Sequence, residues 1–126
     1  ADSEMVDRMF RSLTLAATLL AAPASAEAPM LLEATATPGG GGWTISVTLM
    51  HADTGWDHYA SGVKVLAPDG SPLAEIDIPH PHDAGVPFTE TVAGVAVPPG
   101  ADHVLLRLRC TLDGWEARSH RLDLPH

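Results

Sequence analysis

Cysteine, lysine and aromatic residues are scarce in this chain of 126 residues, and each scarcity limits what the protein can be. Because Cys110 is the single cysteine, no internal disulfide can form, and stability must come from packing or from a bound ion. Seven basic residues stand against 16 acidic ones, a formal net charge of −9, which argues against nucleic acid or an anionic membrane surface as a partner. The sequence contains no Gly-x-Ser-x-Gly elbow, phosphate loop or zinc-protease helix, so we predict no catalytic residue.

Long apolar runs are also lacking, apart from one near the start of the sequence. The run LTLAATLLAA, residues 13–22, follows two arginines and precedes an Ala-Ser-Ala site at residues 24–26, which is the layout of a secretory signal peptide. It is shorter than the roughly 20 residues that span a bilayer. We therefore expect residues 1–26 to be a cleaved signal peptide. Residues 27–126 would then form a single domain that is periplasmic or secreted and not inserted in a membrane.

The rest of the chain has an apolar period of two, which is typical of strands. In WTISVTL, residues 43–49, the side chains of Trp43, Ile45, Val47 and Leu49 share one face. Turn signals rich in glycine and proline separate such segments, and no helical stripe of useful length occurs. We predict an all-β fold, a Greek-key sandwich of the immunoglobulin or fibronectin type, with a small closed barrel as the alternative. The expected strands, about seven, are residues 31–37, 43–49, 63–67, 73–78, 87–100, 103–112 and 115–124.

All seven histidines follow residue 50, and two of them flank a proline in the stretch PHPH. If the chain is extended there, His80 and His82 project to the same side, about 6–7 Å apart. Pro79 and Pro81 restrict the backbone and so reduce the entropy lost on holding both rings. Two imidazoles can share a copper or zinc ion, although two ligands alone bind weakly. The alternative is a stiff, solvated loop.

A second loop, HADTGWDHY, adds His51 and His58. Residues 63–67 and 73–78 should form a hairpin, so the chain after residue 78 returns to the end of the fold where this loop lies. The sequence therefore predicts a metal site for copper or zinc, with Asp53 or Asp57 as a further partner, built from His51, His58, His80 and His82. The alternative is a metal-free surface that binds an unknown protein or small ligand through Asp53, Trp56, Asp57, Tyr59 and Phe88. A purely structural loop face is the third interpretation.

The remaining candidates are predicted to be structural. Cys110 shares the apolar face of its strand, so we expect it to be buried as a small hydrophobic residue. We expect His103 and His120 at strand ends or on the sheet, and His126 on a loose terminus.

Two segments carry a resemblance to known proteins. HADTGWDHY at residues 51–59, followed by HPH at 80–82 and PFT at 87–89, resembles a group of small exported bacterial proteins of unknown function. The resemblance covers most of residues 43–115 and implies a shared sandwich but no assigned activity. The chain differs from the group at Gly85-Val86, where those proteins have Glu-Gln, and at Asp113, where they have histidine.

A fainter local similarity is to the iron site of superoxide reductases, which lies on an immunoglobulin-like sandwich and uses four histidines and one cysteine. The segment from His51 to His58-Tyr59 is similar to one part of that site, and Cys110 to another. Asp113 stands where that site has a further histidine, which removes a ligand. This similarity implies, as a third hypothesis, an iron-dependent redox protein.

Overall fold

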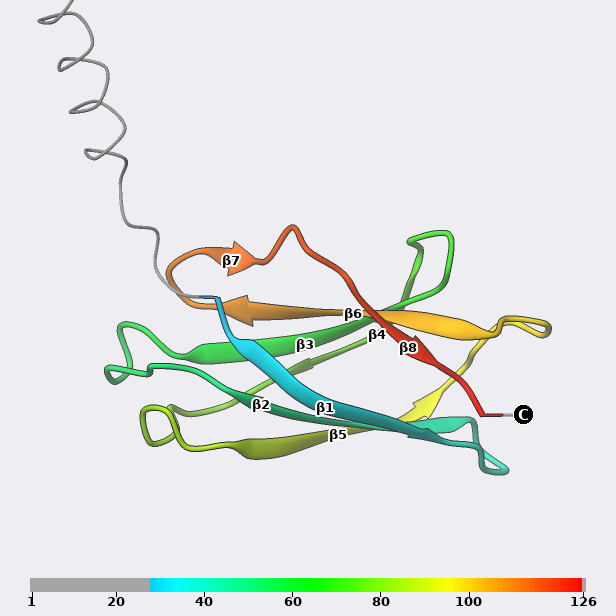
Figure 1. Cartoon of the computed structure of the whole chain (residues 1–126), viewed down its shortest axis with the longest axis horizontal. Helices are drawn as coiled ribbons and strands as arrows, with labels where there is room; N and C mark the ends of the chain where they lie inside the picture. The colour runs from blue at the N-terminus through cyan, green and yellow to red at the C-terminus, as the bar shows by residue number, and fades with distance from the viewer. Residues whose placement is uncertain (1–27, 126) are drawn as a thin grey trace, which may run out of the picture.

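The computed structural model describes residues 28–125, and all regular structure in that part of the chain is β-strand (Figure 1). The predicted signal peptide, residues 1–26, lies outside the described residues, as does His126. No helix that could span a bilayer occurs in the described part. The eight strands are β1 (Met30–Thr37), β2 (Trp43–Met50), β3 (Ala60–Leu66), β4 (Pro72–Asp77), β5 (Phe88–Val95), β6 (His103–Cys110), β7 (Gly114–Trp115) and β8 (His120–Asp123).

The strands form two antiparallel sheets that face each other (Figure 1). One sheet has the order β1-β2-β5. In the other, β4 pairs with β3, β3 with β6, and β6 with both β7 and β8 on its far side. The chain changes sheet after β2, after β4 and after β5, which is the connectivity of a fibronectin-like Greek-key sandwich. The predicted all-β sandwich is confirmed.

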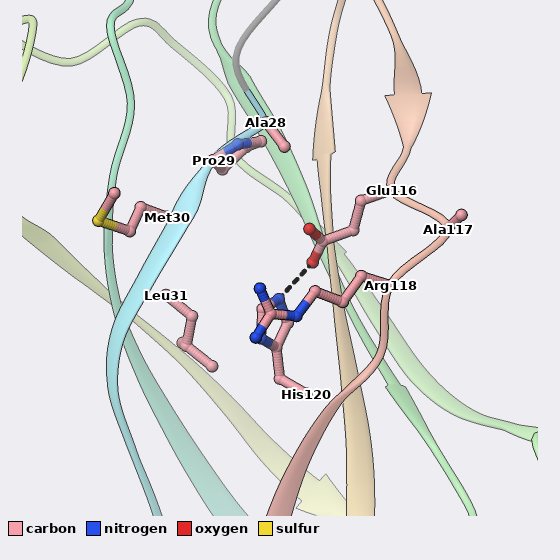
Figure 2. Close-up of a pocket in the computed structure, with 8 residues that line it drawn as sticks. All are labelled: Ala28, Pro29, Met30, Leu31, Glu116, Ala117, Arg118 and His120. Carbon is pink, nitrogen blue, oxygen red and sulfur yellow. Dashed lines mark hydrogen bonds and ion pairs between the residues drawn. The ribbon is translucent and has the colours of Figure 1, made fainter.

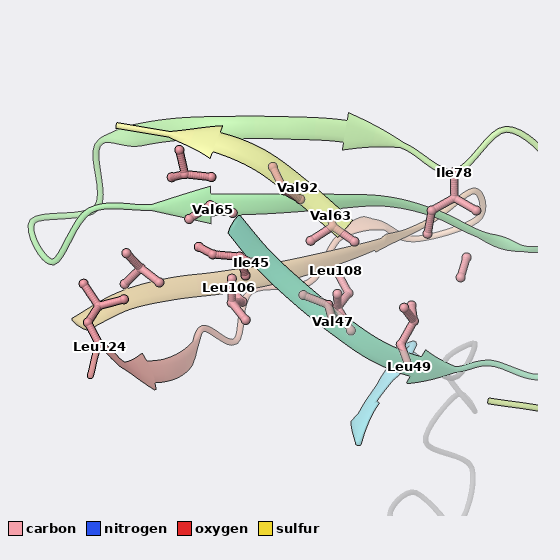
Figure 3. Close-up of a cluster of buried hydrophobic side chains, with 13 residues drawn as sticks. Ile45, Val47, Leu49, Val63, Val65, Ile78, Val92, Leu106, Leu108 and Leu124 are labelled. Carbon is pink, nitrogen blue, oxygen red and sulfur yellow. The ribbon is translucent and has the colours of Figure 1, made fainter. Parts of the chain in front are cut away.

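The core fills the space between the sheets with alternate residues of each strand (Figure 3). On β2 the side chains of Ile45, Val47 and Leu49 are fully buried, as the alternation predicted. Each buried side chain of this size contributes about 1.5–3 kcal/mol relative to an exposed one. The opposite layer comes mainly from β3 and β6, whose buried side chains include Val63, Val65, Val104, Leu106, Leu108 and Cys110.

Several strand boundaries differ from those the sequence predicted; β5, for example, ends at Val95 rather than at residue 100. β3 begins at Ala60, not at residue 63. It therefore includes Gly62, although glycine is typical of turns. The Arg109 guanidinium packs over Gly62 so closely that a Cβ there would lie 2.8 Å from Arg109 Cζ, so this glycine accommodates a neighbouring strand. The predicted strand 115–124 is two short pieces, β7 and β8, separated by residues 116–119. His103 and His120 begin β6 and β8, as expected.

Candidate metal centre

Two loops meet at one end of the sandwich, on the left in Figure 1: the first loop, residues 51–59, and the His-Pro loop, residues 79–87. The His82 N–H donates to Asp53 Oδ2 at 2.8 Å. The Gly85 N–H donates to the His51 carbonyl oxygen at 3.0 Å. The prediction that the β3–β4 hairpin returns the chain to the first loop is confirmed, because these bonds join the two loops directly.

Asp53 is the centre of this junction, and its side chain is only 1% exposed. Its Oδ1 accepts from the Ala60 N–H at 3.1 Å and lies 2.6 Å from His51 Nδ1. A carboxylate oxygen can only accept, so His51 Nδ1 is the donor in that contact. A histidine ring held in this way by a carboxylate presents Nε2 as its ligand atom, which is the usual arrangement around protein-bound metals.

His58 and Cys110 are brought together by the pairing of the first loop with the end of β6. The Tyr59 N–H donates to Thr111 Oγ1 at 3.1 Å, and the Thr111 N–H donates to the Tyr59 carbonyl oxygen at 3.0 Å. One residue further on, Ala60 lies opposite Cys110 in the β3–β6 register. This non-local pairing places the thiol beside the first loop.

His51, His58 and Cys110 form a group that could hold a metal ion, because one ligand atom from each lies within 4.8 Å of the others. The rings of His51 and His58 are nearly perpendicular, at 86°, with centres 4.6 Å apart. An imidazole bound at about 2 Å places its ring centre roughly 3 Å from the ion, so both rings can point at one ion. Ligand atoms of a tetrahedral zinc site are roughly 3.3–3.6 Å apart, so binding requires the group to tighten slightly.

An unsatisfied nitrogen marks this group. His58 Nε2 is buried and has no hydrogen-bond partner among residues 28–125. A buried polar atom left in this state costs about 1–3 kcal/mol, and a metal ion is one partner that would remove the cost. His82 Nδ1 is a second such atom, on the His-Pro loop.

The same residues contain the parts of a thiol catalyst: a cysteine, a histidine and an orienting carboxylate. Cys110 is 1% exposed, and the His51 side chain is 0% exposed. A nucleophilic thiol must be open to its substrate, so this enclosed group suits an ion better than a substrate. One thiolate with two imidazoles is a ligand set that copper and zinc both accept.

The two histidines of the His-Pro loop lie outside the convergent group. The His80 and His82 rings are 4.8 Å apart and tilted by 32°, and neither belongs to the group formed by His51, His58 and Cys110. His82 stacks on Phe88 with ring centres 3.6 Å apart. His80 Nδ1 lies 3.0 Å from the Pro81 carbonyl oxygen, to which its N–H donates.

Three of the other predicted binding residues, Trp56, Asp57 and Tyr59, belong to the first loop itself. Trp56 is 69% exposed and makes an edge contact with Tyr59, with ring centres 5.8 Å apart. Asp57 is exposed, and its carbonyl oxygen accepts from Thr111 Oγ1. Of the two aspartates proposed as partners, the structure buries Asp53 and leaves Asp57 at the surface.

Cys110 is the member of the group that the four-histidine prediction omitted, and only the similarity to the superoxide reductase iron site had linked it with His51 and His58. The expectation of a buried cysteine is confirmed, but its neighbours are the two imidazoles as well as the core. A signal was present in the sequence: His51 and Cys110 each extend the apolar alternation of a strand at the end of that strand, which puts both side chains between the sheets.

Apart from this group, a pocket of about 430 Å³, called the larger pocket below, lies between the start of β1 and residues 116–120 (Figure 2). Within it, His120 Nε2 lies 2.7 Å from Glu116 Oε1, and that oxygen also accepts from the Leu108 N–H at 3.1 Å. Glu116 and His120 therefore satisfy each other and join the β7–β8 connection to β6. The Arg118 side chain points into the pocket.

No protein-family model matches this chain, and no curated protein matches it.

Proposed function

We propose that this domain binds one transition-metal ion, copper or zinc, through His51, His58 and Cys110. The observation that carries the proposal is the buried Nε2 of His58, which has no hydrogen-bond partner in residues 28–125, in a residue that together with His51 and Cys110 could hold a metal ion. Asp53 holds His51 in its liganding orientation. The four-histidine arrangement predicted from the sequence is thereby revised: Cys110 replaces two histidines, and His82 serves to anchor the His-Pro loop to Asp53.

The biological setting that we propose is that of an exported binding protein, periplasmic or secreted. An exported domain with one thiol has no second cysteine with which to form a disulfide, and a metal can supply the stability that disulfides give to other small exported domains.

A metal titration of the purified protein tests the proposal. The melting temperature is measured as zinc, copper or ferrous ion is added. Ferrous ion is added in the absence of oxygen. At a ligand concentration of 100 times the dissociation constant, binding adds about 2.7 kcal/mol. For a domain of about 100 residues this raises the melting temperature by roughly 10–20 °C. Cobalt serves as a spectroscopic probe, because a bound thiolate gives a charge-transfer absorption that Cys110→Ser should abolish.

The decisive variant is His58→Phe, which replaces an unsatisfied ring with an apolar one of similar shape. We expect its metal-free stability to equal or exceed that of the wild type by about 1 kcal/mol, because the penalty of the unpaired nitrogen is gone. Its metal-dependent rise in melting temperature should be lost. The matched control is His103→Gln, at the opposite end of β6 from Cys110, which should keep the rise. A rise retained in His58→Phe would refute the site.

The metal-free interaction domain is the second candidate, and the exposed Trp56 favours it. If no ion changes the melting temperature of the wild type, then Trp56, Tyr59 and Phe88 become the residues to test as contacts for a protein or small ligand. The iron-dependent redox hypothesis requires that ferrous ion stabilise the protein more than zinc does. The likeness to small exported bacterial proteins supports none of the three over the others.

A further inference from the structure

The two methionines of the described chain lie opposite each other. Met30 begins β1 and Met50 ends β2, and the two are partners in the β1–β2 register. Partners in an antiparallel pair point to the same face, with Cβ atoms about 4.5–5.5 Å apart. Two flexible thioethers can therefore reach one ion at this position. Met30 is 54% exposed, whereas a methionine that served only to fill the core would be buried.

The methionine pair lines a pocket that extends to the backbone of His51, beside the proposed metal site. This pocket of about 120 Å³ is bordered by Met30 and Met50, by His51 and Ala52 of the first loop, by Gly85 of the His-Pro loop and by Ala28. Met30 also lines the larger pocket, and in Figure 2 its side chain points away from Glu116 and His120. Because the His51 side chain is 0% exposed, His51 borders this pocket with its backbone, and its ring lies on the inner side, in the buried group.

The chemistry of the ligand atoms narrows the choice of ion. Thioethers and thiolates are soft ligands that select cuprous copper, whereas imidazole accepts zinc, copper and iron alike. Copper in the cuprous state is the ion that suits the Met30–Met50 pair, Cys110 and the two imidazoles together. The proposed function left copper and zinc as equal choices, and the methionine pair separates them.

We propose that Met30 and Met50 form a docking site that receives a cuprous ion before it passes to His51, His58 and Cys110. This inference rests on the proposed function. Because the His51 imidazole is fully buried, an ion reaches it only when the first loop opens. The hydrogen bond from the Gly85 N–H to the His51 carbonyl oxygen closes that route. An outer site of moderate affinity holds the ion until the bond breaks.

The test measures the rate at which the protein takes up cuprous ion from a coloured chelator in the absence of oxygen. The rate of zinc uptake is measured in parallel. The variant is Met30→Leu with Met50→Leu, a volume-conserving change of the kind that folded proteins tolerate best. We expect it to slow cuprous uptake several-fold and to leave zinc uptake unchanged. The matched control is Leu32→Ala, which removes another exposed apolar side chain of β1 and should leave both rates unchanged. An unchanged cuprous rate in the methionine variant would overturn the docking site.

A second measurement observes the pair directly, by the NMR signals of labelled methionine methyl groups in the full chain, assigned with the two single variants. In a His58→Phe, Cys110→Ala protein, in which the buried group is disabled, cuprous ion should still shift the Met30 and Met50 signals, and zinc should not. If these signals do not move while the wild type still binds metal, the docking site is wrong and the buried site stands. If no ion perturbs His58 or Cys110 in the wild type, the proposed function fails, and the docking role fails with it.

Discussion

Replacement of Asp53 should cost this fold more than replacement of any neighbouring acidic residue, because its carboxylate holds three elements together. Its two oxygens accept from the His51 ring, the Ala60 N–H at the start of β3 and the His82 N–H of the His-Pro loop. The side chain is 1% exposed, so water does not replace a lost partner without a local rearrangement. Asp53→Ala leaves three donors without an acceptor.

The magnitude follows from these contacts. An unsatisfied buried donor costs about 1–3 kcal/mol, and partial rearrangement lowers the sum, so we expect Asp53→Ala to lower the free energy of unfolding by about 3–5 kcal/mol. A small domain has only about 5–15 kcal/mol in all. Asp53→Asn keeps one oxygen but turns an amide N–H₂ toward a donor, so its cost should be smaller, about 1–3 kcal/mol.

Equilibrium urea denaturation measures these values, and hydrogen exchange adds a local readout. The matched control is Asp83→Asn, an exposed acidic residue in the same His-Pro loop, which should change stability by less than about 0.5 kcal/mol. In Asp53→Asn the amides of Ala60 and His82 should exchange faster than in the control. Metal affinity should also fall by about 10–100-fold, because His51 loses the group that orients it. A cost for Asp53→Ala equal to that of the control would refute this account of the junction.

Two further predictions concern the rest of the sandwich. Gly62→Ala should lower the free energy of unfolding by about 1–3 kcal/mol, because its Cβ would lie 2.8 Å from Arg109 Cζ and would displace the guanidinium from the Trp115 ring. Denaturation followed by tryptophan fluorescence measures this loss. An equal loss in an Arg109→Ala background would contradict the explanation. The hydrogen bond from His103 holds the pKa of Asp102 below its ordinary value of 3.8. The carboxylate therefore stabilises the fold above pH 3.8, and this contribution is lost as the pH falls through the lower pKa of the folded state. The stability difference between wild type and Asp102→Asn should therefore shrink between pH of about 5 and about 3 in urea denaturation, and a constant difference would show that this carboxylate has no such role.

Alternation and turn chemistry were enough to predict the sandwich, because they depend on neighbours in the sequence. The face of β2 with Ile45, Val47 and Leu49 is visible in its period of two. The meeting of the two loops was also predictable, since a hairpin must return to the end from which it started. The start of β3 was not predictable, because glycine is typical of turns. Only the Arg109 side chain, which belongs to another strand, explains why Gly62 lies within β3.

The candidate site was predictable in its location but not in its ligands. His51 and His58 belong to one loop, so their proximity is a local property. Cys110 joins them through the register of β3 with β6 and the bonds between Tyr59 and Thr111, which no local pattern encodes. Likewise, the sequence left Asp53 and Asp57 equivalent, and only the path of the loop decides which of them is buried.

The balance of energies at this end of the fold favours a ligand over a purely structural role. A sandwich can close its end with apolar side chains, as Leu49 and Ile78 do nearby. Here a buried carboxylate, a buried imidazole and a thiol occupy that space, and His58 Nε2 has no partner within residues 28–125. The carboxylate and His51 satisfy each other, so they carry little net cost, but His58 Nε2 gains no hydrogen bond from residues 28–125. Ion binding would convert its penalty of about 1–3 kcal/mol into a bond. The unpaired nitrogen, more than the number of histidines, is therefore the reason to expect metal at this site.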